Sequence, residues 1–73
     1  MLNQHTFTAV IHREEDLYVA DCPEVGTVSQ GLTLEEAVAN LKEATELYLE
    51  EVEYKPDEKS KSFITTFEAT VNA

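Results

Sequence analysis

The side chains that could carry out chemistry in this sequence are two histidines, one cysteine and fifteen aspartates and glutamates. His5 and His12 are seven positions apart in one predicted strand, so strict alternation places them on opposite faces and they cannot bind one metal ion together. Cys22 has no second cysteine near it, and the neighbouring Asp21 would raise rather than lower the pKa of its thiol. We therefore expect no metal site, no cofactor and no catalytic nucleophile.

Paired carboxylates could instead hold magnesium for phosphodiester hydrolysis. The candidates are Asp21 in a predicted strand and either Glu36 or Glu43 in a predicted helix. Because Glu36 and Glu43 are seven residues apart, they share the side of the helix that lies almost opposite its apolar stripe, and they point away from the sheet. We therefore expect a solvated acidic face, and we do not expect an enzyme.

The chain is organised around a helix that we expect to run from Leu34 to about Glu53. Thr33 occupies the N-cap position and Glu36 follows three residues later, which is the capping-box arrangement. Gly31 permits a backbone turn that a side chain would hinder. Residues at steps of three and four form the predicted apolar face: Leu34, Ala37, Val38, Leu41, Thr45, Tyr48 and Val52.

Short alternating segments on either side of the helix are typical of strands. Three of them precede it, at residues 4–13, 17–22 and 27–30, and a fourth follows it at residues 62–71. The predicted fold is therefore α+β, in the order β-β-β-α-β. It consists of a mixed, mostly antiparallel sheet with the helix on one face.

One face of the predicted sheet points away from the helix. We place Val10, Tyr18 and Ala20 on that face, which makes it too apolar to be left in water. A second copy of the chain would cover it, so we expect a homo-oligomer, either a dimer or a tetramer.

Length and charge narrow the possible functions. The chain has 73 residues and a net charge of −10, which predicts one small domain spanning residues 1–73 that repels nucleic acid and anionic membranes. The same charge would attract a basic protein, although acidity can also serve solubility alone. The sequence shows no signal-peptide pattern and no apolar run long enough to cross a bilayer, so we expect a cytoplasmic protein.

A docking surface is predicted on the outward side of the helix. Leu47 lies on the same side as Glu43 and Glu50, and a leucine framed by carboxylates could contact a basic protein. The candidate partner-binding residues are Glu43, Glu46, Leu47, Glu50 and Glu51.

Several short motifs between the second predicted strand and the end of the helix resemble the HicB-type antitoxin family. They are CPEV at 22–25, VSQG at 28–31, Thr33, EA at 36–37, NLKEA at 40–44 and LYLE at 47–50. The resemblance implies a truncated ribonuclease-H-like domain that lacks the nuclease carboxylates. It also implies a small basic toxin as partner, one that cleaves mRNA with a histidine and is blocked by the antitoxin.

Many HicB-type proteins carry a further DNA-binding segment after this domain. Here the sequence ends at Ala73, just after the last predicted strand, so we expect no C-terminal DNA-binding domain. Two other functions stay open: a solitary acidic HicB-like oligomer with an unknown partner, and a magnesium-dependent nuclease.

Overall fold

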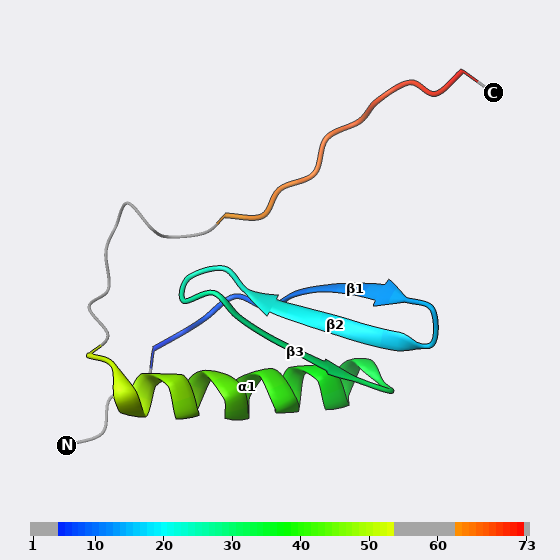
Figure 1. The fold of residues 1–73 in the computed structure, drawn as a ribbon. Coiled ribbons are helices and arrows are strands. Elements are labelled where there is room, and N and C mark those ends of the chain that lie inside the picture. Colours follow the sequence, from blue (N-terminus) through cyan, green and yellow to red (C-terminus); the bar gives the residue numbers. More distant parts are fainter. Residues whose placement is uncertain (1–4, 54–62, 73) are drawn as a thin grey trace.

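The computed structural model describes residues 5–53 and 63–72 (Figure 1). Its elements are, in order, β1 (Val10–Glu14), β2 (Leu17–Cys22), β3 (Thr27–Gly31) and α1 (Leu34–Glu51). The strands form one antiparallel sheet in the order β1-β2-β3, and α1 lies along one of its faces. The predicted α+β fold is confirmed in its β-β-β-α part.

The first hairpin is tight and its register is regular. Val10 pairs with Asp21 and Glu14 pairs with Leu17, so only two residues form the turn, and Glu15 adopts a φ of 54° there. The predicted strand at residues 4–13 therefore begins later than expected. Val10 pairs with Asp21, so of the residues before Val10 only Ala9 would still lie opposite a β2 residue, Cys22, because Pro23 follows and ends the strand. Gln4 lies outside the described residues.

The second hairpin turns at Gly26. The Gly26 amide donates to the carbonyl oxygen of Cys22 over 2.7 Å, and its φ of 85° is a conformation that glycine adopts without strain. Cys22 then pairs with Thr27 and Tyr18 with Gly31, which places β3 beside β2 over its whole length.

The capping box that starts α1 is confirmed. Thr33 is extended, with φ −127° and ψ 163°, and its hydroxyl accepts a hydrogen bond from the Glu36 amide over 3.0 Å. The Glu36 carboxylate in turn accepts from the Leu32 amide over 2.8 Å, one residue before the N-cap amide of Thr33 that a standard capping box uses. The helix ends at Glu51, two residues before the predicted end, because Val52 is already extended.

Gly31 joins β3 to α1 by close approach rather than by an unusual turn. An added Cβ atom there would lie 2.5 Å from the Ala37 nitrogen and 2.8 Å from the Glu36 carbonyl carbon. Gly31 has no positive φ, unlike Gly26, so a side chain is excluded here by lack of room, in agreement with the prediction that a side chain would hinder the turn. Any side chain at Gly31 would push the start of the helix off the sheet.

The core between sheet and helix is small. Its buried apolar residues are Ala20, Cys22, Ala37 and Leu41, and Phe7, Ala9, Ile11, Tyr18 and Val25 pack against them. Tyr18 and Ala20 therefore face the helix, and their predicted place on the opposite face was wrong. The register explains this, because Ala20 pairs with Ile11 and both must point to the same side.

The fourth predicted strand is not part of the sheet. Residues 63–72 form no strand, and Figure 1 shows them leading away from the body of the molecule. Phe63 and Phe67 are 86% and 88% exposed. Alternation gives a segment the pattern of a strand, but a strand also needs a hydrogen-bonding partner, and here these residues have none in the sheet. Ser62 lies outside the described residues.

No helix within residues 5–53 and 63–72 combines the length and the apolar character needed to cross a membrane.

Candidate partner-binding surface

Glu43, Leu47 and Glu50 lie together on the outward side of α1, whereas Glu46 lines a pocket together with Lys42 and Leu49. Glu43, Glu46, Leu47, Glu50 and Glu51 are all exposed, and 57% of the Leu47 surface is accessible. The opposite side of the helix carries the buried residues Ala37, Leu41 and Thr45. The helix is thus amphipathic, with its acidic surface and its buried residues on opposite faces.

The carboxylates of this surface differ in their surroundings. The Lys42 ammonium lies 3.0 Å from the Glu46 carboxylate, an exposed pair one helical turn apart that partly neutralises Glu46. Across the described part of the chain, Glu43, Glu50 and Glu51 are in no ion pair. These three carboxylates therefore remain available to an external cation.

The position of Glu50 and Glu51 adds to the negative potential. Both lie in the last turn of α1, where the unpaired carbonyl groups already make the helix end negative, and that turn contains no basic residue. The carboxylates repel this end of the helix dipole. A basic partner would remove that repulsion as well as forming new ion pairs.

The structure does not bring together the carboxylates considered for magnesium. Asp21 lies on the sheet face away from α1, Glu36 is engaged in the capping box, and Glu43 points outward from the helix. Within residues 5–53 and 63–72 there is no group of three or more histidine, cysteine or acidic side chains that could hold a metal ion.

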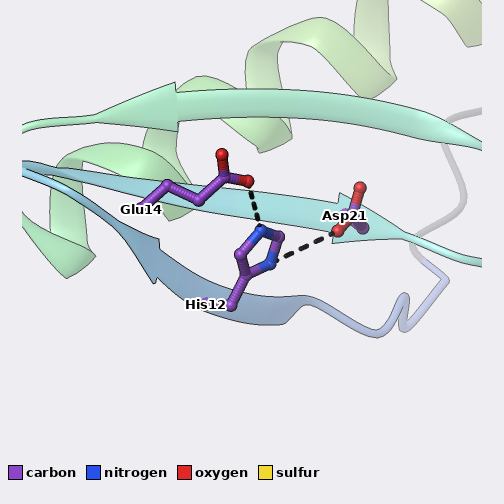
Figure 2. A network of polar contacts seen from close by, with 3 residues as sticks. All are labelled: His12, Glu14 and Asp21. Carbon is purple, nitrogen blue, oxygen red and sulfur yellow. Dashed lines mark hydrogen bonds and ion pairs between the residues drawn. The ribbon is translucent and has the colours of Figure 1, made fainter.

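A second polar cluster, which sequence reasoning missed, lies on the outer face of the sheet (Figure 2). The His12 Nε2 atom is 2.7 Å from Glu14 Oε2, and its Nδ1 atom is 4.0 Å from Asp21 Oδ2. Positions 12 and 14 share a face by alternation, and the hairpin register adds position 21 from the neighbouring strand. Both ring nitrogens of His12 thus lie near carboxylates, and all three side chains are at least partly exposed, so the cluster is a surface network of polar contacts.

Comparison with known proteins shows the family of the chain. A UPF0150 protein of Synechocystis sp. is 39% identical over 54 residues, which is 71% of this chain and 78% of that protein. The chain belongs to the UPF0150 family. A UPF0150 protein of Helicobacter pylori is 52% identical over 46 residues, which is 62% of this chain and 64% of that protein.

Neither a family model nor a solved structure matches the chain. The names of the two UPF0150 relatives state no activity and no partner.

The CPE motif of this UPF0150 chain has a structural role. The Glu24 carboxylate accepts hydrogen bonds from the Thr8 amide over 3.0 Å, from the Thr8 hydroxyl over 2.6 Å and from the Cys22 thiol over 3.5 Å. Glu24 therefore holds the segment before β1 against the turn that follows β2. We call this arrangement the Glu24 clamp.

The pKa shifts in the clamp fit a structural role. Burial raises the pKa of the Cys22 thiol, and the nearby Glu24 carboxylate adds to that effect, so the thiol stays protonated and unreactive. Burial also acts to raise the pKa of Glu24, but the hydrogen bonds from Thr8 outweigh it and the net pKa is lowered. The predicted contribution from Asp21 does not appear, because Asp21 is on the other face of the sheet.

Proposed function

We propose that this UPF0150 chain is a non-catalytic, HicB-type antitoxin-like module that binds and neutralises a small basic mRNA-cleaving toxin. The contact surface is the acidic outward side of α1, with Glu43, Leu47, Glu50 and Glu51 at its centre. The proposal places the protein in the cytoplasm, where such a toxin would meet mRNA.

The observation that carries the proposal is the combination of charge and exposure on α1. Three carboxylates without an ion pair in the described residues surround a leucine that is 57% exposed. An apolar centre with charged surroundings is the usual composition of a protein-binding patch. Its sign selects a cationic partner, and the net charge of −10 would speed the approach of that partner.

The chemistry of the proposed partner supports the same surface. A protein that cleaves mRNA needs a cationic surface to hold the phosphate backbone. An acidic helix can occupy that surface and compete with RNA, with no reaction of its own. The resemblance of residues 22–50 to HicB-type antitoxins points to this kind of inhibition.

Co-expression provides the first test. The probe is the product of a short neighbouring reading frame that encodes a basic protein with a histidine. We expect that product to stop growth, this chain to restore growth, and the two proteins to co-purify. Absence of both rescue and co-purification contradicts the proposal.

A charge-reversal pair locates the contact. Glu43→Lys combined with Glu50→Lys should weaken binding by at least about tenfold and flatten its salt dependence, because two attractive contacts become repulsive. The matched control is Glu15→Lys combined with Asp16→Lys, which changes net charge equally at the exposed β1–β2 turn. Equal losses for the two double variants would show that net charge acts without any specific contact at α1.

A further inference from the structure

A groove runs between α1 and the segment that precedes β1. It has a volume of about 650 Å³, and residues 5–9 form one wall. The opposite wall is the side of α1 that carries Val38, Leu41 and Leu49, and Cys22 lies between the walls. Phe7 is only half-buried in the first wall, so apolar surface on both sides of the groove remains in contact with solvent.

The groove lies near β1, one of the two edge strands of the sheet. At the opposite edge, α1 covers β3: the Asn40 amide donates to the Gln30 carbonyl oxygen over 2.8 Å, and Gly31 packs directly against the first turn of the helix. Among the described residues, β1 pairs only with β2, so its second edge has free backbone donors and acceptors. An uncovered strand edge is a template for another strand.

The segment at residues 63–72 has the properties of a strand that lacks a sheet. Its apolar side chains alternate, with Phe63, Phe67 and Val71 on one face, and these three are at least 82% exposed. It carries a single charged residue, Glu68, in a chain whose net charge is −10. Acidic repulsion is therefore weak at this segment, which suits it to contact a second copy.

We propose that residues 63–71 of one copy add as a strand to the free edge of β1 in a second copy, and that Phe63 and Phe67 fill the groove there. The exchange is reciprocal, so one two-fold dimer satisfies both free edges and fills both grooves. Figure 1 shows the segment already extended and directed away from its own sheet.

A second copy fits better than the segment's own sheet for two reasons. Within residues 5–53 and 63–72 the buried apolar core contains four residues, of which only Leu41 is large, and a chain of this size commonly gains further burial by association. Within one chain, moreover, the segment lies clear of the sheet although the β1 edge is open.

This dimer differs from the one predicted from sequence. That prediction used the outer sheet face, but Tyr18 and Ala20 point toward the helix, so that face is less apolar than expected. The exchanged strand uses the β1 edge and leaves Glu43 and Glu50 exposed. The proposal is therefore independent of toxin binding, and either proposal can fail alone.

The test uses the full chain at micromolar concentration. Sedimentation equilibrium should give twice the chain mass of 8.2 kDa. In a sample mixed from isotopically labelled and unlabelled protein, filtered NOEs should join the Phe67 ring of one copy to the Val38 and Leu49 methyl groups of the other. A monomer, NOEs confined to one chain, or a dimer that lacks these NOEs would each overturn the proposal.

A matched pair of substitutions separates the groove contact from general charge repulsion. Phe67→Glu should raise the dimer dissociation constant by at least about tenfold, because a carboxylate would enter the apolar groove. Thr66→Glu adds the same charge one residue earlier, on the opposite face of the strand, and should change the constant by less than about threefold. Equal effects of the two substitutions would also overturn the proposal. If Phe67→Glu fails to fold, the NOEs of the wild-type protein alone test the proposal.

Discussion

The helix α1 packs closely against the β3 edge of the sheet but not against the β1 edge. On the β3 side, backbone meets backbone at Gly31, and Thr45 forms a hydrogen bond of 2.7 Å with Thr27. On the β1 side, α1 and residues 5–9 stand apart and enclose a groove of about 650 Å³. The β3 side is thus closed by direct packing, whereas the Glu24 clamp and the packing of Phe7 and Ala9 against the core hold the segment on the β1 side.

The difference shows that small residues determine where the helix can pack directly against the sheet. Gly31 and Ala37 allow β3 and α1 to approach closely, and Ala37 is completely buried. The corresponding helix residues on the groove side, Val38 and Leu49, are larger but remain partly exposed because no strand covers them. Apolar residues alone do not close a core; an element must lie opposite them.

The largest effect is expected from Gly31→Ala. The new Cβ would lie 2.5 Å from the Ala37 nitrogen. Because that nitrogen belongs to the helix backbone, β3 and the first turn of α1 must move apart. We expect the free energy of unfolding to fall by about 3 kcal/mol, measured by urea denaturation.

Gly26→Ala is the matched control for that substitution. Nothing lies within 4 Å of its added Cβ, so only the strain of a φ of 85° remains. That strain should cost about 1 kcal/mol. Equal losses at the two glycines would show that close approach does not hold β3 against α1.

The next effect concerns the clamp on the open side. Glu24→Gln keeps the size of the side chain but removes the charge that accepts two hydrogen bonds from Thr8. We expect the free energy of unfolding to fall by about 1 kcal/mol at neutral pH. This is less than the cost of removing a fully buried charged hydrogen bond, because the site is partly solvated.

The loss at Glu24 should depend on pH with a definite sign. The pKa of Glu24 is lowered on folding, so its stabilisation is complete above the ordinary value of 4.5 and disappears as the pH falls through the folded pKa. Wild type and Glu24→Gln should therefore converge in acid. Glu15→Gln, in the exposed turn, is the control and should leave stability within about 0.5 kcal/mol at every pH.

The sequence was informative where local rules apply. The capping box predicted the start of α1 at Leu34, and alternation predicted β2 with its bounds at residues 17–22. Each of these depends on residues within a few positions of one another. The outward carboxylates of α1 were likewise found from helical periodicity, and they are exposed as predicted.

Sequence reasoning failed where distant partners decide the outcome. Alternation grouped Tyr18 with Ala20 correctly, but only the pairing of Ala20 with Ile11 shows that this group faces the helix. The Glu24 clamp joins residues sixteen positions apart and has no periodic pattern. The segment at 63–72 shows the same limit, because its alternation predicts a strand without indicating which edge it joins.

A smaller effect is expected from the hydroxyl pair on the closed side. Thr45→Val keeps the shape of a side chain that is 5% exposed but removes the partner of Thr27. The expected loss is about 1 kcal/mol, because the Thr27 hydroxyl is half-buried and loses its hydrogen bond. Changing both residues to valine should recover most of the loss, since neither site then contains an unpaired polar group. A double variant as unstable as the single one would show that packing, rather than hydrogen bonding, sets the cost.

The smallest effect is expected at Asn40, whose amide covers the β3 edge by donating to the Gln30 carbonyl oxygen over 2.8 Å. Asn40→Ala should leave stability almost unchanged, because the lost hydrogen bond of about 0.5 kcal/mol is offset by the higher helix propensity of alanine. Asn40→Ser removes the reach of the side chain with less gain in propensity, so it should cost about 0.5 kcal/mol in the same urea titrations. If Asn40→Ala were instead more stable than the wild type and Asn40→Ser cost nothing, the hydrogen bond of Asn40 would contribute nothing, because only the propensity gains would remain. The expected cost at Asn40→Ser would show that α1 protects one sheet edge through a side chain, which the β1 edge lacks among the described residues.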